Sequence, residues 1–475
     1  MGYYISTRGD NTRLRASEAI LKGLANDGGL YVPQVFPKLQ KDWKELGDLN
    51  YQELAFEIMR VFLKDFSEEE LKNCIKNAYD DSFTNSKIAP IKKVGDVGIL
   101  ELFHGPTLAF KDMALTILPY LMTTSMKKHG IKEKVVIITA TSGDTGKAAL
   151  AGFAEVEGTE IIVFYPKDGV SKIQELQMIT QKGENTHVVG IDGNFDDAQT
   201  GVKEIFENKD FNKTLLEKGY VLSSANSINI GRLLPQVVYY FYGYFQQVKM
   251  GEIRIGDSIN YVVPTGNYGN ILAGYWAKKL GLPINKLICA SNENKILTDF
   301  LNDGEYDINR EFKKTLSPSM DILVSSNLER LLYDLSDSST VSKLIEELKD
   351  KGVYKINDEM KSKLKECFLG YNCDDEETLK TINDVYSKYD YIMDTHTSVA
   401  YCAYEKYKKH RNKLIKTVVI KTSSPFKFSG LFMQQQKDEA KAPHLWLVTG
   451  AIKRYGCPVF LLSDLLSFFL NLYHD

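Results

Sequence analysis

The sequence is poor in cysteine and histidine, the residues that build disulfide frameworks and most transition-metal sites. Its 475 residues include 6 cysteines and 7 histidines, with no CxxC pair and no HxxxH pair among them. Scattered cysteines of this kind are typical of isolated thiols in a reducing compartment, so neither a disulfide-stapled secreted fold nor a zinc knuckle is indicated. We therefore expect no metal site.

An excess of one charge and long apolar runs are also missing. The 59 basic and 62 acidic residues leave a net charge of -3, and basic residues are interspersed with acidic ones. No basic surface for nucleic acid is therefore indicated. Residues 1–10 lack the apolar stretch of a signal peptide, and no uncharged run approaches the roughly 20 residues of a membrane-spanning helix. We expect a cytoplasmic protein with neither nucleic-acid nor membrane partners.

What the sequence does have is length and a hydrophobic content of 43%, enough for more than one packed lobe. Up to about Asp96 the pattern is helical. Residues 16–24 and 51–63 carry apolar side chains three and four positions apart, and Ser67 to Glu70 resembles an N-terminal capping box. We expect residues 1–96 to form a helical cap on the rest of the chain.

From Val97 onward, short β-branched runs alternate with helix-length segments. Five runs are apolar on both faces, as buried parallel strands are: 135–138, 160–164, 187–191, 261–263 and 417–420. Glycine-rich or polar turns follow the first four of them. This alternation predicts an α/β fold in which helical crossovers cover both faces of parallel sheet.

The first candidate site residue is Lys111, which follows a Gly-Pro turn and has apolar neighbours. Active sites of open α/β sheets lie beyond the carboxyl ends of the strands, where this segment is expected. Burial lowers the pKa of a lysine, and a neutral amine is the form that condenses with an aldehyde. Taken alone, the pattern is explained more simply by a surface lysine whose stem lies on apolar residues.

A second loop, rich in hydroxyls and glycine, runs from Thr139 to Lys147 directly after an expected strand. It approaches the phosphate-binding pattern GxxxxGK[ST], but Thr141 and Ala148 stand where that pattern needs Gly and then Ser or Thr. A kinase or ATPase is therefore disfavoured. The loop can still present N–H and O–H donors to a carboxylate or phenolate. Its Lys147 is the competing candidate for an amine that binds an aldehyde.

Two further segments offer hydrogen-bond donors to anions. Residues 263–275 open a helix, and the glycines there, Gly266 among them, allow close backbone approach to a phosphate and positive φ. Residues 223–232 combine hydroxyls and amides with the guanidinium of Arg232, which suits a second phosphate. Each segment by itself is equally well explained as an ordinary turn or N-cap. The order of all four segments along the chain is what indicates one shared site.

In that order the motifs resemble those of the threonine synthase family, of the long microbial type, within the fold-type II pyridoxal-phosphate enzymes. The resemblance extends from Met1 to about Phe428 and is carried by residues 6–9, 23–33, 104–112, 142–146, 165–178 and 266–270. It implies two parallel-sheet domains with helices on both faces, plus a helical N-terminal cap. The implied division is a cap over 1–96, a large cofactor-binding domain over 97–134 and 216–475, and a small α/β domain over 135–215.

The resemblance also implies roles for the matching residues. Lys111 would hold pyridoxal 5'-phosphate covalently and, once freed, move protons as the catalytic residue. The cofactor's phosphate would lie against Gly266, Asn267, Tyr268, Gly269 and Asn270, and its pyridine nitrogen against the neutral hydroxyl of Thr422. Substrate binding would fall to two sets of residues: Ser142, Gly143, Asp144 and Thr145 near the substrate carboxylate, and Asn226, Ser227, Asn229 and Arg232 at the substrate phosphate.

The reaction implied by the resemblance is the conversion of O-phospho-L-homoserine and water to L-threonine and phosphate, in a monomer or homodimer. A serine/threonine dehydratase with the same cofactor would not need a second phosphate site, so residues 226–232 favour the synthase. A non-catalytic homologue that binds phosphorylated ligands would be expected to lack Lys111, which is present.

The C-terminal sequence departs from the family's pattern. After Phe428 the family continues into a charged amphipathic helix and a final strand, whereas residues 441–475 end in an apolar run from about Phe460 to Leu470. A genuine variant and a change of reading frame near Gly430 both explain this tail. Either one bears on the packing of the last helices more than on the chemistry.

Overall fold

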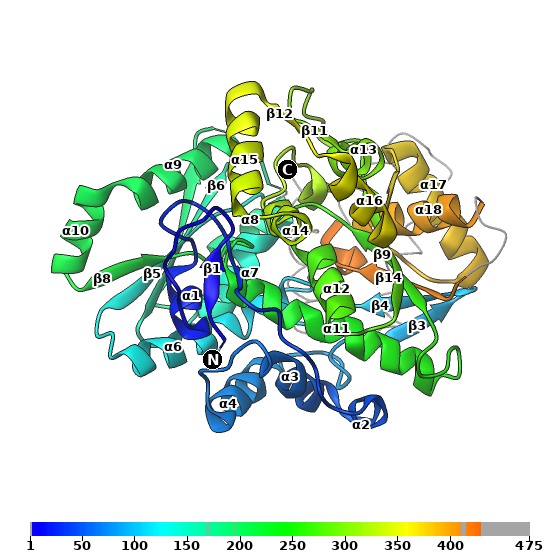
Figure 1. Cartoon of the computed structure of the whole chain (residues 1–475), viewed down its shortest axis with the longest axis horizontal. Coiled ribbons are helices and arrows are strands. Elements are labelled where there is room, and N and C mark those ends of the chain that lie inside the picture. The colour runs from blue at the N-terminus through cyan, green and yellow to red at the C-terminus, as the bar shows by residue number, and fades with distance from the viewer. Residues whose placement is uncertain (1, 168, 171, 194, 410–414, 429–475) are drawn as a thin grey trace, which may run out of the picture.

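The computed structural model describes residues 2–167, 169–170, 172–193, 195–409 and 415–428. The divergent tail lies outside the described residues. Within them the chain forms two main parallel sheets, one of six strands and one of four (Figure 1). Helices pack on both faces of each sheet and bury its apolar side chains. The expected α/β architecture of a fold-type II enzyme is confirmed.

The six-stranded sheet forms the right half of the molecule in Figure 1. Its spatial order is β13 (Phe368–Asn372), β10 (Ile284–Ser291), β9 (Ile259–Pro264), β14 (Thr417–Lys421), β4 (Val97–Glu101) and β3 (Ile91–Val94). The first five strands are parallel, and β3 pairs antiparallel with β4 at one edge. Helices α11 (Ile230–Lys249) and α12 (Gly269–Lys279) cover one face, while α17 (Asp375–Tyr389) and α18 (Thr395–Lys409) cover the other.

The four-stranded sheet is wholly parallel and lies on the opposite side of the molecule (Figure 1). Its order is β7 (Thr186–Ile191), β6 (Thr159–Pro166), β5 (Lys134–Ala140) and β8 (Tyr220–Ser223). The expected strands within β5, β6, β7, β9 and β14 are therefore all present. The expectation that β7 is buried on both faces is wrong, because this strand forms the sheet's edge and alternates between exposed and half-buried residues.

The N-terminal region contributes helices, as expected, but it is not wholly helical. Helices α1 (Ala16–Lys22), α2 (Trp43–Asp48), α3 (Tyr51–Met59) and α4 (Glu68–Ala78) form, and β1 (Tyr4–Ser6) pairs antiparallel with β2 (Tyr31–Pro33). The expected capping box begins α4: Ser67 Oγ accepts from the Glu70 amide at 3.1 Å, and Glu70 Oε2 accepts from the Ser67 amide at 2.7 Å.

Two strands lie beyond the segments that the sequence assigns to their domains. β3 falls within residues 1–96 yet pairs with β4, and β8 falls after residue 215 yet pairs with β5. Neither strand carries a continuous buried run, since Lys92 and Lys93 of β3 are exposed and most of β8 is half-buried. The sequence pattern of these strands therefore gave no signal, and the three-domain division remains a prediction.

The remaining elements connect the sheets or cover them. They are α5 (Asp112–Leu115), α6 (Leu118–His129), α7 (Asp144–Phe153), α8 (Lys172–Ile179), α9 (Phe195–Glu207), α10 (Lys209–Glu217), α13 (Ile296–Asp303), α14 (Leu328–Leu335), α15 (Ser338–Lys351), α16 (Asp358–Cys367), the strand pair β11 (Glu305–Asp307) and β12 (Val353–Lys355), and the 3-10 turns η1 (Pro318–Met320) and η2 (Pro425–Phe428). Among the described residues, no helix combines the length and apolarity needed to cross a bilayer.

Candidate active site

Lys111 lies at the start of α5, at the end of the loop that follows β4. The loop's turn is fixed because Thr107 donates to Asp112 from its backbone amide at 2.9 Å and from its hydroxyl at 2.5 Å. A side chain at Gly105 would collide with Asp112, at 2.5 Å from its Cβ, so this turn requires glycine. The Lys111 side chain is only 13% exposed. The alternative of a surface lysine is therefore wrong.

Burial lowers the pKa of Lys111 to about 8, and the positive charges of Lys427 and Arg232 act in the same direction. The nearby carboxylate of Asp144 opposes them. An amine with a pKa of about 8 is mostly protonated at pH 7, but its neutral fraction, about a tenth, is far larger than that of an ordinary lysine. The neutral form is the one that attacks an aldehyde or accepts a proton.

Asp144 begins α7 just past the carboxyl end of β5. Its side chain is the part of the four-stranded sheet's loops that lies beside Lys111. Its Oδ2 lies 3.9 Å from Lys111 Nζ, and its Oδ1 lies 2.6 Å from Lys427 Nζ and accepts from Gln174 Nε2 at 3.1 Å. Burial alone would raise the pKa of the Asp144 carboxyl, but the two lysines reverse this and hold it well below its usual range. Asp144 is therefore an anion between two cations.

The residues next to Asp144 in sequence stabilise the conformation of its loop and do not contact Lys111. Thr141 Oγ1 accepts from the amides of Gly143 at 2.9 Å and Gly146 at 2.8 Å. Gly143 has φ 127°, and a Cβ there would lie 2.4 Å from Gln174. Ser142 and Thr145 are half-buried in the same turn. Lys147, the competing lysine, donates to Gln181 at 2.5 Å, and burial lowers its pKa to about 8 as well.

Two residues that sequence reasoning missed complete the surroundings of Lys111. Lys427, on η2, is 4% exposed and pairs with Asp144. Ser319, on η1, accepts from Lys111 Nζ at 3.5 Å and donates to Asp144 Oδ2 at 3.4 Å. The Ser319 amide donates in turn to His396 Nε2 at 3.1 Å, and His396 Nδ1 lies 3.3 Å from Asp394. Lys427 stands five positions after Thr422. Its place in the same segment as a predicted site residue is the signal that could have identified it.

The loop from Gly266 to Asn270 leads from β9 into α12. Its carbonyls are turned away: Ser325 Oγ donates to Gly266 O at 2.8 Å, and the Asn327 amide and side chain donate to Asn267 O at 3.2 and 3.1 Å. In the part of the chain that the structure describes, no protein group accepts from the five amides of this loop. A row of unpaired amides at a helix N-terminus is an anion-binding arrangement.

The reason for glycine at position 266 differs from the expected one. Gly266 does not adopt positive φ, and it is Tyr268 that lies in the left-handed region, at φ 62°. A Cβ on Gly266 would lie 2.6 Å from the carbonyl oxygen of Ser319. Close packing of η1 against the loop is therefore what excludes a side chain there.

Asn270, the last residue of the loop, has a buried side-chain donor. Its Oδ1 accepts from the hydroxyls of Tyr239 at 2.6 Å and Tyr240 at 2.8 Å. Its Nδ2 is buried without a hydrogen-bond partner in the described part of the protein. Because an unpaired buried donor costs about 1–3 kcal/mol, this atom suits a ligand acceptor.

Residues 223–232 pass beside the same loop, since a Cβ on Gly269 would lie 4.0 Å from Ser227 Cβ. Asn229 caps α11: its Oδ1 accepts from the Gly231 amide at 2.9 Å, and its Nδ2 donates to Ile20 O at 2.9 Å and Ser224 O at 3.0 Å. All its polar groups are thus engaged within the fold. The Asn226 carbonyl accepts from the Asn229 amide at 3.1 Å and so belongs to the same turn. Asn229 positions this turn.

Arg232 is the most unusual residue of the segment. Its side chain is buried, Nη1 donates to Ala225 O at 2.5 Å, and Nε has no partner among the described residues. Burial lowers the pKa of Arg232 to about 10, with no carboxylate contributing to the shift. A buried cation without a counter-ion is costly, which makes this position suited to an anionic ligand.

Arg330, also missed from the sequence, ties these segments together. Its Nε donates to Tyr31 O at 3.0 Å, its Nη2 donates to Ile228 O at 2.5 Å, and its Nη1 donates to Asn327 Oδ1. One buried guanidinium therefore joins the N-terminal region, the Arg232 segment and the segment that holds the Gly266 loop.

Thr422 follows β14 and lies next to the lysine loop. Its carbonyl accepts from the Phe110 amide at 2.7 Å, and the Ser424 amide donates to Leu108 O at 3.0 Å. Thr422 itself is 4% exposed. The structure thus brings this residue beside the segment that ends in Lys111.

Comparison with known proteins gives consistent similarities. Residues 3–79 match the family described as "Threonine synthase N terminus", and residues 96–422 match "Pyridoxal-phosphate dependent enzyme". The chain is 38% identical to threonine synthase of Saccharomyces cerevisiae, over 90% of this chain and 87% of that protein. It is 40% identical to threonine synthase of Pseudomonas aeruginosa, over 90% of this chain and 88% of that protein.

The human "Threonine synthase-like 1" protein is also similar, at 40% identity over 91% of this chain, but the chain spans only 60% of that protein's length. Among solved structures, yeast threonine synthase superposes with a TM-score of 0.85 at 35% identity, covering 94% of each chain. Pyridoxal-phosphate-bound threonine synthase of Brucella melitensis superposes with a TM-score of 0.83 at 37% identity, covering 90% of each chain.

Proposed function

Because the chain belongs to the threonine synthase family of pyridoxal-phosphate-dependent enzymes, we propose that it converts O-phospho-L-homoserine and water to L-threonine and phosphate. The observation that carries this proposal is Arg232, a buried guanidinium with no carboxylate partner among the described residues. Its charge lies close enough to Lys111 to lower the pKa of the Lys111 amine. The substrates of a serine or threonine dehydratase carry no phosphate that could bind such a guanidinium.

The residues around Lys111 fit the cofactor that the family uses. A buried amine of lowered pKa, a loop of unpaired amides and the spare donor of Asn270 match an aldehyde and a phosphate on one small molecule. When bound, pyridoxal 5'-phosphate supplies the aldehyde that lysine and substrate amines attack and the electron sink for carbanions. We assign the covalent link to Lys111 and the phosphate to the amides of Gly266 to Asn270.

Lys111 has the properties of the residue that moves protons. Once its Nζ is free, the lowered pKa leaves it able to take a proton from one substrate carbon and return it to the next. Ser319 Oγ and Asp144 Oδ2 lie 3.5 and 3.9 Å from the amine, and the bond between them, at 3.4 Å, makes them one polar group against which Nζ rests. Burial and the cations Lys427 and Arg232 all lower the pKa of Lys111. The negative charge of Asp144 opposes them and keeps this pKa from falling further.

Substrate recognition is assigned to the two remaining segments. Arg232, with Ser227 and Asn226 nearby in the same segment, is assigned to the phosphate that leaves, and the turn from Ser142 to Thr145 to the substrate carboxylate. Asn229 acts as a positioning residue, since its amide holds this turn to the N-terminal region. Thr422 is assigned to the cofactor's ring nitrogen, where a hydroxyl, unlike a carboxylate, leaves the nitrogen unprotonated.

The test is whether the purified chain releases phosphate and L-threonine from O-phospho-L-homoserine. Deamination of serine or threonine without phosphate release would replace this proposal with the dehydratase. We further propose that the reaction takes place in the cytoplasm. We expect a monomer or homodimer, and sedimentation of the purified protein would distinguish the two.

A further inference from the structure

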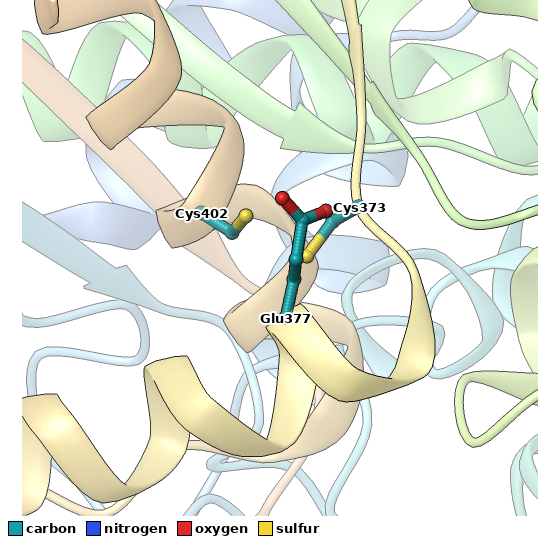
Figure 2. Close-up of side chains that lie close together, drawn as sticks. All are labelled: Cys373, Glu377 and Cys402. Carbon is teal, nitrogen blue, oxygen red and sulfur yellow. The ribbon is translucent and has the colours of Figure 1, made fainter.

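Two cysteines and a glutamate, distant in the sequence, come together between α17 and α18 (Figure 2). Cys373 directly follows β13, Glu377 lies in the first turn of α17, and Cys402 lies near the middle of α18. The two sulfur atoms and a carboxylate oxygen all lie within 4.8 Å of one another. Cys373 is fully buried and Cys402 is 7% exposed, whereas Glu377 reaches toward solvent.

This spacing fits the first coordination shell of a small divalent cation. Around tetrahedral zinc, sulfur lies at about 2.3 Å and carboxylate oxygen at about 2.0–2.2 Å, so that neighbouring ligand atoms are less than about 4 Å apart. An upper limit of 4.8 Å places the three atoms within small side-chain adjustments of that shell. Three protein ligands would leave a fourth position for solvent.

Glu377 is held in place by groups outside the cluster. Its Oε2 accepts from the Asp374 amide at 3.2 Å and from Lys406 Nζ at 2.6 Å, and Lys406 also donates to Asn372 O at 2.8 Å. Both contacts use the same oxygen, and neither engages Oε1. Outer contacts that orient a ligating carboxylate in this way are typical of protein metal sites.

The charges of the cluster also balance with a divalent cation present. Two thiolates and one carboxylate carry three negative charges, and the cation together with the Lys406 ammonium carries three positive ones. A neutral sum matters because Cys373 and Cys402 are buried, where unpaired charge is costly.

A divalent cation bound here requires both cysteines to be thiolates. A thiolate is the form of cysteine that binds metal, and the metal itself displaces the thiol protons.

We propose that Cys373, Glu377 and Cys402 form a binding site for a thiophilic divalent cation, with Zn²⁺ as the expected occupant. Thiolate ligands select against Mg²⁺ and Ca²⁺, which take oxygen ligands. The ion would join the start of α17 to α18, and α18 packs on β9, β10, β13 and β14. Spacing rules predicted no metal because the two cysteines belong to different elements and form no short motif.

The test uses the full-length, cofactor-loaded protein, kept reduced with a phosphine and stripped with a chelator before zinc chloride is added. Zinc retained after gel filtration is measured by elemental analysis, and affinity is measured by competition with a chromophoric chelator. We expect one zinc per chain in the wild type. Cys402→Ser should retain none, and Glu377→Gln should bind about 10-fold more weakly or worse, because even losing an outer contact of a metal ligand typically costs about 10- to 100-fold.

The matched control is Cys74→Ser. The Cys74 thiol is also buried and also lies beside a threonine hydroxyl, 3.4 Å from Thr124 Oγ1, as Cys373 lies 3.5 Å from Thr378 Oγ1. This variant should keep its zinc. Glu377→Gln decides the matter if Cys402→Ser does not fold, because glutamine can still accept from the Asp374 amide. The proposal is overturned if reduced wild type retains no zinc, if both site variants retain it, or if the anaerobically purified chain contains a Cys373–Cys402 disulfide.

Discussion

The two parallel sheets contribute to the site in different ways. The six-stranded sheet supplies Lys111 after β4, the Gly266 loop after β9 and Thr422 after β14, and every residue of these three strands is buried. The four-stranded sheet is only partly covered: the residues of β7 are exposed or half-buried, and none of the residues of α10 is buried. It reaches Lys111 through Asp144. The deeply buried sheet therefore carries the groups that we assign to the cofactor, and the shallower sheet carries the charged residue that lies beside Lys111.

The largest expected effect separates two lysines that burial affects alike. Lys111 and Lys147 both have a pKa near 8, but only Lys111 lies beside Asp144 and Ser319, while Lys147 bonds to Gln181. Lys111→Ala should therefore abolish borohydride-reducible attachment of pyridoxal phosphate, and Lys147→Ala should retain it. Mass spectrometry of the reduced proteins measures this. Attachment that survives in Lys111→Ala but not in Lys147→Ala would reverse the assignment.

The next effect concerns recognition of the leaving phosphate. Losing the partner of a desolvated charge costs about 2 to 5 kcal/mol, so Arg232→Ala should lower kcat/KM for O-phosphohomoserine by about 30-fold to several thousand-fold. The visible absorbance of the lysine-bound cofactor should stay unchanged. Arg232→Lys should recover only part of the loss, because an ammonium lacks the bidentate fork. A full recovery by lysine would show that charge alone is recognised.

A smaller effect compares two glycines, one from each side of the molecule. Gly266→Ala places a Cβ 2.6 Å from a backbone carbonyl, whereas a Cβ at Gly201, in α9, meets nothing within 4 Å. We expect Gly266→Ala to weaken cofactor retention during dialysis by about 5-fold to 150-fold, from a strain of about 1–3 kcal/mol. Gly201→Ala should leave retention unchanged and, as a helix-favouring change, stabilise slightly. Equal retention in both variants would remove the Gly266 loop from the cofactor site.

The smallest effect is a shift in pH dependence. Uptake of pyridoxal phosphate by the cofactor-free protein needs neutral Lys111, so its rate should rise as the pH passes about 8. Asp144 raises the pKa of Lys111 and Lys427 lowers it. Asp144→Asn should therefore move the rise to lower pH, and Lys427→Met should move it to higher pH. Stopped-flow absorbance against pH measures both midpoints, and shifts of the same sign would contradict the arrangement.

Much of this arrangement could be predicted from sequence because its signals are local. The runs in β5, β6, β9 and β14 are continuous, and Asp144 and the Gly266 loop follow two of them directly. Lys111 was found from its Gly-Pro turn and apolar neighbours, and it lies at the end of the loop after β4. Residues brought in by tertiary packing carried no such signal. Ser319 and His396 are separated from Lys111 by hundreds of residues, and Arg330 reaches three distant segments at once.

Some conformational details also lay beyond the sequence. Glycine at position 266 suggested positive φ, yet close packing against Ser319 is what requires it, and Tyr268 takes the left-handed conformation. Asn229 suggested a substrate ligand, yet its amide is used within the fold. In both cases the residue type was informative, but its role depended on which distant segment packs against it.

The most direct test of the central claim, that Arg232 and its segment recognise a phosphate on the substrate, is a ratio of two rates. Phosphate release from O-phospho-L-homoserine and deamination of L-serine are measured on the same cofactor-loaded preparation, for wild type and Arg232→Ala. We expect the wild type to favour the phosphorylated substrate strongly and Arg232→Ala to lose only this activity. Equal losses on both substrates, or a wild type that acts on serine but releases no phosphate, would contradict this claim.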